Sequence, residues 1–267
     1  MAQPELSPVH LALLLDDPGA AGVISDFDGT LAPIVDDPDR ARPLPDAADV
    51  LHRLAHRFGR VAVVSGRPVS FLAEHLNTDE CGEGSGCEGL VLAGLYGLER
   101  VEGSEVVTDP DVERWRSVIS ELVELAEEEA PDGVTVETKG LSVTLHYRKA
   151  PEHQDWVHSW AREHGERTGL SVHGGRMSQE LRPPVDVDKG SVVRELAEGL
   201  GAVCFLGDDV GDLPAFAALD GLAGESGVAT LKVAVRSEEA TDELLEQADV
   251  QVDGPEGALD LLRRLLE

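Results

Sequence analysis

Three short apolar runs, each followed at once by polar and glycine-containing chain, constrain the fold of this 267-residue protein most strongly. They cover residues 23–25, 61–64 and 203–206. Because these runs are apolar at successive positions, they predict strands that are buried on both faces, as in a parallel sheet. Helical periodicity over residues 45–57 and 191–200 supplies helices between them. We therefore predict an α/β fold whose core is a Rossmann-like, doubly wound parallel sheet.

A segment with a different pattern, residues 106–183, interrupts this alternation. Its apolar periodicity predicts two helices and four strands in the order αββαββ, over residues 109–130, 134–138, 142–147, 153–168, 170–173 and 177–181. Turns at Lys139-Gly140 and Gly174-Gly175-Arg176 join the strands in pairs, which favours a mostly antiparallel sheet. We predict that this segment is an inserted α/β cap domain and that residues 1–105 and 184–267 form the core.

The charge balance excludes several kinds of partner. Acidic residues outnumber basic ones 52 to 22, so the formal charge is -30. Nucleic-acid backbones and anionic membranes are held by clustered Lys and Arg, so we predict neither as a partner. No apolar segment approaches the roughly 20 residues that cross a bilayer, and the first residues lack a secretory pattern. With only three cysteines, Cys81, Cys87 and Cys204, we expect a cytoplasmic protein with reduced thiols.

The strongest chemical signal directly follows the first predicted strand. Asp26 and Asp28 lie two residues apart, and Gly29 lets the chain turn sharply after them. This pair suits phosphoryl transfer, because one carboxylate can attack phosphorus while the other protonates the leaving oxygen and later activates water. An isolated Asp-x-Asp is more often a turn or a helix cap. Polar segments after the other strands favour the catalytic interpretation, since the ends of parallel strands meet at one edge.

Two further segments could hold a phosphoryl group. Ser65 offers a hydroxyl, Gly66 a backbone amide and Arg67 a cation. Lys189 opens a predicted helix, so that its ammonium and the helix N-terminus can both point at an anion. Taken singly, the first segment is a common turn and the lysine a common surface residue.

Three carboxylates, Asp208, Asp209 and Asp212, follow the last of the apolar runs. Oxygen ligands of this kind suit octahedral Mg²⁺, which prefers a few carboxylates and several waters. The alternative is an acidic loop that caps the next helix.

Together these segments, in this order, resemble the haloacid-dehalogenase-like phosphotransferases. The resemblance implies that Asp26 is the nucleophile, that Asp28 is the general acid and base, and that Lys189 binds the phosphoryl group. It also implies an Mg²⁺ cofactor held by Asp26, the main-chain oxygen of Asp28 and Asp208, completed by Asp209 or Asp212. The insert corresponds to the large cap of the sugar-phosphatase branch of that superfamily.

Within this branch, the chain resembles the trehalose-6-phosphate phosphatases from about residue 23 to its end. The resemblance rests on residues 26–34, 94–99, 137–142, 146–148, 175–177 and 180–183. It implies that Glu137, Lys139 and Glu180 bind sugar hydroxyls, with Arg182 beside them. Without the resemblance, these residues could be ordinary exposed charges on hairpins. The implied substrate is a phosphorylated disaccharide, hydrolysed to trehalose and phosphate, with a functional link to a trehalose-6-phosphate synthase.

Two positions depart from the family pattern. Gly211 stands where the family usually has Thr and offers no side-chain oxygen to the outer metal shell. Tyr96 replaces a His before the cap, so a phenol takes the place of an imidazole.

Three alternatives remain open. The same core residues would serve a phosphatase of sucrose phosphate, glucosylglycerate phosphate or a hexose phosphate, and only the cap distinguishes these substrates. A phosphotransferase would pass the phosphoryl group to a second sugar instead of water. A non-catalytic sugar-phosphate sensor would be expected to lose a carboxylate from the first motif, and both are present.

Overall fold

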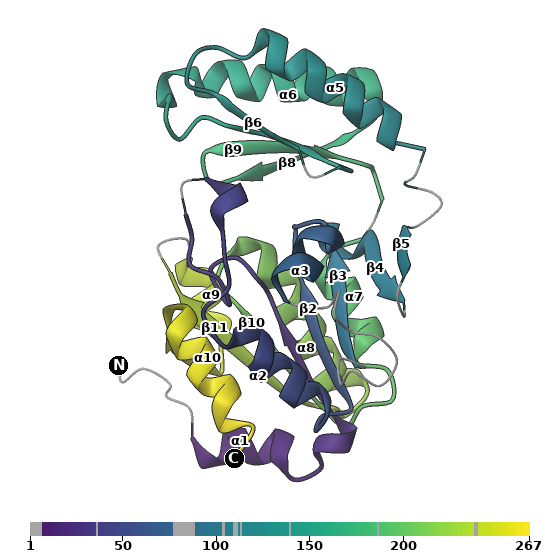
Figure 1. The fold of residues 1–267 in the computed structure, drawn as a ribbon, viewed down its shortest axis with the longest axis vertical. Helices are drawn as coiled ribbons and strands as arrows, with labels where there is room; N and C mark the ends of the chain where they lie inside the picture. Colours follow the sequence, from purple (N-terminus) through teal and green to yellow (C-terminus); the bar gives the residue numbers. More distant parts are fainter. Residues whose placement is uncertain are drawn as a thin grey trace. The chain divides into compact units, whose positions relative to one another are not determined.

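A computed structural model describes the fold of residues 7–35, 37–76, 89–102, 105–108, 112, 114–138, 140–185, 187–237 and 240–267. The chain divides into two compact units (Figure 1). One unit combines Met1–Val107 with Val187–Glu267, and the other is Thr108–Asp186. The predicted insert differs from the second unit by two or three residues at each end. Among the described residues, no helix has the length and apolar character needed to cross a membrane.

The first unit contains an eight-stranded sheet in the order β12-β11-β10-β1-β2-β3-β4-β5. The neighbouring pairs from β12 to β3 are all parallel, whereas β4 runs antiparallel to β3. The strands are β1 (Ala21–Ser25), β2 (Arg60–Val64), β3 (Leu90–Gly94), β4 (Glu99–Glu102), β5 (Glu105–Thr108), β10 (Ala202–Gly207), β11 (Ala229–Arg236) and β12 (Val250–Asp253).

Helices cover both faces of this sheet. One apolar cluster includes residues of α1 (Pro8–Leu15), α2 (Ala47–Ala55), α3 (Val69–His75) and α10 (Gly254–Arg264). The other includes residues of α7 (Lys189–Leu196), α8 (Leu213–Glu225) and α9 (Asp242–Gln247).

The central strand β1 shows why the apolar runs are continuous. All five of its residues are buried, with Val23 in the first cluster and Ile24 in the second. Because successive side chains point to opposite faces, a strand covered on both sides must be apolar at every position. The predicted α/β fold with a doubly wound parallel sheet is therefore confirmed.

Several helices differ from their predicted bounds. The helix predicted over residues 45–57 is shorter, α2 (Ala47–Ala55), and α6 begins at Gln154, one residue later than predicted. Helix α7 begins at Lys189, two residues early, because Asp188 caps it by accepting the N–H of Ser191 (2.8 Å). It ends at Leu196, and Gly199 beyond it has a left-handed φ of 79°. The helix predicted over 109–130 is α5 (Arg116–Glu129). Within the described part of the predicted span, residues 114 and 115 form a turn before it.

The second unit is a four-stranded antiparallel sheet in the order β6-β7-β9-β8. Its elements are α5, β6 (Thr135–Thr138), β7 (Val143–His146), α6 (Gln154–Thr168), β8 (Ser171–Gly175) and β9 (Ser178–Arg182). One face packs against the helices, with Val143 and Leu145 in a cluster with Ile119 and Trp160. The predicted αββαββ order is the observed one.

The turn between β8 and β9 lies later than predicted. Gly174 and Gly175 belong to β8, and Gly175 pairs with Ser178. The turn consists of Arg176 and Met177, and Met177 takes a left-handed φ of 55°. Glycine normally supplies this conformation, which is why the sequence favoured a turn at the glycine pair.

The described residues also contain five short 3-10 segments: η1 (Pro18–Ala20), η2 (Pro38–Arg40), η4 (Leu95–Gly97), η5 (Pro151–His153) and η6 (Val210–Asp212).

Candidate active site

The parallel pairing of β1 with β10 brings the first and last predicted motifs together. The two strands are in register up to Ser25 and Leu206. The next residue, Asp26, donates its backbone N–H to the carbonyl oxygen of Leu206 (2.8 Å). Asp26 and Asp208 therefore leave the sheet side by side, at the carboxyl ends of adjacent strands, which is where open α/β sheets bind ligands.

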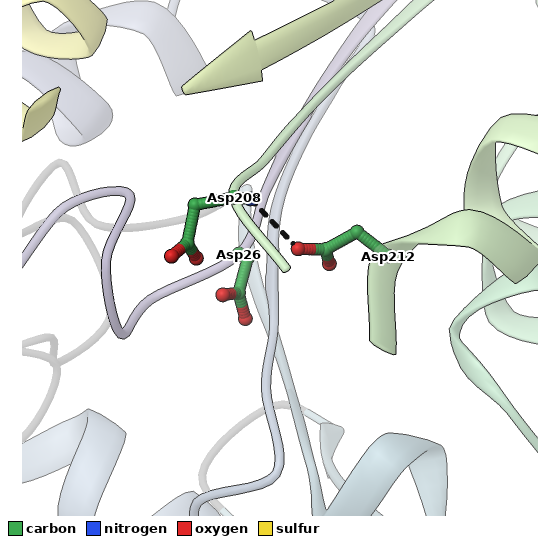
Figure 2. A group of neighbouring side chains, drawn as sticks. All are labelled: Asp26, Asp208 and Asp212. Carbon is green, nitrogen blue, oxygen red and sulfur yellow. Dashed lines mark hydrogen bonds between the residues drawn. The ribbon is translucent and has the colours of Figure 1, made fainter. Parts of the chain in front are cut away.

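Asp26, Asp208 and Asp212 form a compact carboxylate group (Figure 2). Each contributes one oxygen, and these oxygens all lie within 4.8 Å of one another. All three residues are buried. A buried set of carboxylate oxygens fits a hard divalent cation such as Mg²⁺, which prefers oxygen ligands.

Lys189 supplies the positive charge inside this group. As the first residue of α7, it is only 4% exposed. Its Nζ lies 2.8 Å from Asp26 Oδ1 and 2.6 Å from Asp212 Oδ1. Buried ions of this kind depend on their partners, because each is removed from water.

Asp212 also organises the loop that follows β10. Its Oδ2 accepts the backbone N–H of Asp208 (2.8 Å) and of Asp209 (3.2 Å). The first of these bonds is drawn in Figure 2. Gly207 makes room for it, since a Cβ there would lie 2.3 Å from Asp212 Cγ. Asp212 thus fixes the backbone of Asp208 as well as facing Lys189.

Asp209 faces its own loop. Its Oδ1 accepts the backbone N–H of Gly211 (2.8 Å), and a Cβ on Gly211 would lie 3.0 Å from that oxygen. The carboxylate group of Asp26, Asp208 and Asp212 does not include Asp209. The glycine that departs from the family pattern is therefore part of a cap within the loop.

Two hydroxyls that the sequence did not single out contact Asp208. Ser237 Oγ donates to Oδ2 (2.9 Å), and Thr30 Oγ1 lies 3.5 Å from Oδ1. Gly29, with a φ of 77°, lets the chain pass close by, because a Cβ there would lie 2.0 Å from Asp208 Oδ2. Ser237 directly follows β11, the neighbour of β10, so the rule that located the other motifs could also have located it.

Burial dominates the electrostatics of this group. Burial, reinforced by the charges of Asp26 and Asp212, raises the pKa of Asp208 to about 9. Burial also raises the pKa of Asp26 well above its ordinary value, and it raises the pKa of Asp212. Burial disfavours the charged form of Lys189, but Asp212 and Asp26 outweigh this and raise its pKa. The ammonium contacts two of the three carboxyl groups. A divalent cation bound among them would favour the charged form of all three.

Asp28 is held by Arg67 in a contact that the sequence did not predict. The guanidinium donates through Nε and Nη2 to the two carboxylate oxygens, each at 2.8 Å. Arg67 also lies over the ring of Phe71, 4.7 Å from its centroid, and its backbone N–H donates to Ser65 Oγ (3.1 Å). This two-point pairing fixes the plane of the carboxylate of Asp28.

Tyr96 packs against the predicted phosphate-binding turn. It takes a left-handed conformation (φ 59°, ψ 22°), and its backbone N–H donates to the carbonyl oxygen of Ser65 (2.9 Å). A Cβ on Gly66 would lie 2.8 Å from Tyr96 Oη. The absence of a side chain at residue 66 thus allows the phenol to approach the turn.

In the second unit, the predicted sugar-binding carboxylates lie in one row of the sheet. Glu137 of β6 and Glu180 of β9 both pair in register with Thr144 of β7. Glu137 Oε2 lies 2.8 Å from His146 Nε2, and Glu180 Oε1 accepts a hydrogen bond from Ser142 Oγ (2.7 Å).

Arg182 Nη2 lies 3.3 Å from His173 Nδ1 on the neighbouring strand β8. Burial, with the adjacent Arg182, lowers the pKa of His173. Lys139, the third predicted sugar-binding residue, lies outside the described residues, as do Cys81 and Cys87.

Comparison with known proteins gives a consistent picture. A sequence model of the trehalose-phosphatase family matches residues 24–251. The trehalose-phosphate phosphatase of Mycolicibacterium paratuberculosis is 37% identical over 211 residues, which cover 74% of this chain and 51% of the relative. The trehalose-phosphate phosphatase of Mycobacterium marinum is 33% identical over 227 residues, which cover 78% of this chain and 53% of the relative. The chain thus spans about half the length of these curated relatives.

Solved structures agree at the level of the fold. The crystal structure of a trehalose-6-phosphate phosphatase related protein has a TM-score of 0.75 at 22% identity, covering 92% of this chain and 96% of its own. The C-terminal domain of trehalose-6-phosphate phosphatase from C. albicans has a TM-score of 0.74 at 22% identity, covering 99% and 98%.

Proposed function

The chain belongs to the trehalose-phosphatase family, and on this basis we propose that it hydrolyses trehalose 6-phosphate to trehalose and phosphate. The observation that carries the proposal is the position of Asp26. It directly follows the central strand β1, contacts Lys189, and shares one buried group with Asp208 and Asp212. This arrangement joins a nucleophile, a fixed cation and oxygen ligands for a metal at one strand edge.

The reaction proceeds in two displacements. A carboxylate oxygen of Asp26 attacks phosphorus, the bond from phosphorus to the sugar oxygen breaks, and Asp28 gives its proton to the departing sugar. Asp28 then takes a proton from water as the water oxygen attacks the aspartyl phosphate. Phosphate leaves, and Asp26 is regenerated. Each displacement is thereby assisted by a proton transfer at an oxygen that gains or loses charge.

Residues around Asp26 and Asp28 bind the phosphoryl group and position the general acid. Lys189 offsets the negative charge of the phosphoryl oxygens, and Ser65 and the amide of Gly66 bind those oxygens. The sequence predicts that Arg67 binds the phosphoryl group. Because its guanidinium holds both oxygens of Asp28, we assign it instead to positioning the acid.

Asp26, Asp208 and Asp212 would hold Mg²⁺, with the main-chain oxygen of Asp28 and a water on Asp209 as further ligands. Bound there, the ion would offset charge on the transferring phosphoryl group.

Glu137, Glu180, Lys139 and Arg182 bind the disaccharide. Carboxylates accept hydrogen bonds from sugar hydroxyls, and such charge-assisted bonds are about twice as strong as neutral ones. Trehalose 6-phosphate as the substrate also implies a synthase elsewhere in the cell that makes it.

Phosphate release from a panel of sugar phosphates tests the proposal. We expect release from trehalose 6-phosphate in Mg²⁺, none with excess EDTA, and none from Asp26→Asn. Hydrolysis by Asp26→Asn at close to the wild-type rate would refute the nucleophile. Equal or higher activity on sucrose phosphate, glucosylglycerate phosphate or glucose 6-phosphate would refute the substrate while leaving the chemistry intact.

Two cap variants test the substrate more directly. Glu137→Ala and Glu180→Ala should weaken hydrolysis of trehalose 6-phosphate, because each removes a charged acceptor for sugar hydroxyls. Glu124→Ala, on the exposed surface of α5, is the matched control and should leave it unchanged. Unaltered kinetics in both cap variants would place sugar recognition elsewhere.

A further inference from the structure

One face of the sheet in the second unit carries the polar side chains of β7. Because side chains alternate along a strand, Thr144 and His146 point to one side, while Val143 and Leu145 point to the helices. Ser142, just before β7, reaches the same side, since its hydroxyl bonds to Glu180. We call the side with Thr144 the polar face. It also carries Glu137 and Glu180, which pair in register with Thr144.

One carboxylate beside Thr144 bonds to a residue of β7, and the other to the residue just before this strand. Glu137 is bonded to His146, two residues after Thr144, at 2.8 Å. Glu180 is bonded to Ser142, two residues before it, at 2.7 Å. The two bonds run diagonally in opposite directions along the strand, so the hydroxyl of Thr144 lies between two carboxylates that are engaged with its neighbours.

The Thr144 hydroxyl has no partner of its own. Thr144 is 4% exposed, and its Oγ1 finds no hydrogen-bond partner in the part of the chain that the structure describes. A buried hydroxyl without a partner is unfavourable, and valine has the same shape without this cost. Packing of the ligand-free protein therefore does not explain a threonine at this position, whereas a ligand that bonds to the hydroxyl would.

We propose that Thr144 determines substrate specificity by hydrogen bonding a hydroxyl of the sugar, between hydroxyls bound by Glu137 and Glu180. This inference rests on the proposed function, since it takes the substrate to be a sugar phosphate. Because the Thr144 hydroxyl has no partner among the described residues, a bond to the sugar would replace no bond within the protein. The neighbouring acids supply acceptors and Thr144 supplies a donor, which suits adjacent sugar hydroxyls.

Three variants of the full chain, assayed with Mg²⁺, test this role. Thr144→Val removes the hydroxyl and keeps the shape, Thr144→Ser keeps the hydroxyl, and Thr230→Val makes the same change at the amino end of β11 in the other unit. We expect Thr144→Val to raise KM for trehalose 6-phosphate about tenfold with little change in kcat. The KM of Thr144→Ser should stay within about threefold of the wild-type value. The KM of Thr230→Val should equal the wild-type value.

Thermal unfolding separates binding from structure. All three tryptophans, Trp115, Trp156 and Trp160, lie in the second unit, so their fluorescence reports its unfolding. Ligand-free Thr144→Val should unfold at the wild-type temperature or above it, since the change removes an unpaired buried hydroxyl.

Each other outcome counts against the inference. A wild-type KM in Thr144→Val, or a failure of Thr144→Ser to restore it, would overturn the assignment. A lower unfolding temperature in Thr144→Val would give the hydroxyl a structural role instead. If the wild type releases no phosphate from trehalose 6-phosphate, the proposed function fails, and this inference fails with it. Normal wild-type turnover with an unchanged Thr144→Val refutes the inference alone.

Discussion

Replacement of Lys189 by Met gives the most direct measure of the electrostatics at the strand edge. The ammonium contacts Asp26 (2.8 Å) and Asp212 (2.6 Å) while only 4% exposed. Methionine fills a similar volume but leaves both carboxylates buried without a counter-charge. Removing one partner of a buried ion pair costs about 3–5 kcal/mol. At about 2–4 °C per kcal/mol for a unit of this size, we expect the metal-free variant to melt roughly 10 °C lower.

The loss of stability in Lys189→Met should depend on pH, and the electrostatics of the site predict the direction of this dependence. Lys189 lowers the pKa of Asp26 and of Asp212 against the effect of burial, so its removal raises both further. Carboxyls with a pKa raised in the folded state bind more protons there than in the unfolded chain, and stability falls as pH rises. The deficit of Lys189→Met should therefore be smaller at pH 5 than at pH 8.

Circular dichroism in the far ultraviolet, with EDTA present, is the suitable assay. Tryptophan fluorescence would miss the effect because the tryptophans all lie in the other unit. Lys232→Met is the matched control. It breaks a 2.6 Å pair with Asp220, whose side chain is 57% exposed, and such pairs contribute at most about 1 kcal/mol. A deficit no larger than that of the control, or one that grows as pH falls, would refute this reasoning.

Three further outcomes follow from the same contacts. Mg²⁺ should raise the melting temperature more at pH 8 than at pH 6, because the ion competes with a proton on Asp208, whose pKa is about 9; an equal rise at both would contradict this. Arg67→Lys loses the two-point contact with Asp28 and should lower kcat about tenfold while leaving Mg²⁺ affinity, measured by calorimetry, unchanged; an unaltered kcat would refute the positioning role. With a formal charge of -30, the protein should melt at a higher temperature as NaCl rises from about 0.01 M to about 1 M, where the Debye length falls from about 30 Å to about 3 Å; a flat or falling melting curve would show that surface repulsion is not limiting.

The sequence predicts the core well because burial leaves a strong pattern there. A strand covered on both faces has few positions for a polar side chain, and the only hydroxyl of β1, on its last residue Ser25, is bonded to the carbonyl oxygen of Asp26. The apolar runs of β1 and β10 can therefore be recognised from their own sequences. The grouping of Asp26 with Asp208 follows from a general rule, since parallel strands bring their carboxyl ends to one edge.

The side-chain contacts that position the carboxylates of the site are harder to predict from the sequence. Arg67 and Asp28 are 39 residues apart, and their pairing depends on how two turns direct their side chains. Ser237 is bonded to Asp208, but a lone serine after a strand resembles many loop residues. Met177 takes a turn conformation that the sequence assigned to nearby glycines, because conformational preference is a tendency that the pairing of two strands can override.

The backbone connects the two units at only two places, between residues 107 and 108 and between 186 and 187. Every residue to which we assign chemistry on phosphorus belongs to the discontinuous unit, and every residue to which we assign sugar recognition belongs to the insert. Recombination at these two junctions would therefore exchange all the residues assigned to sugar recognition together and leave the residues assigned to phosphoryl chemistry unchanged. A chimaera made at those two junctions should combine the substrate specificity of the donor's insert with the catalytic residues of this protein.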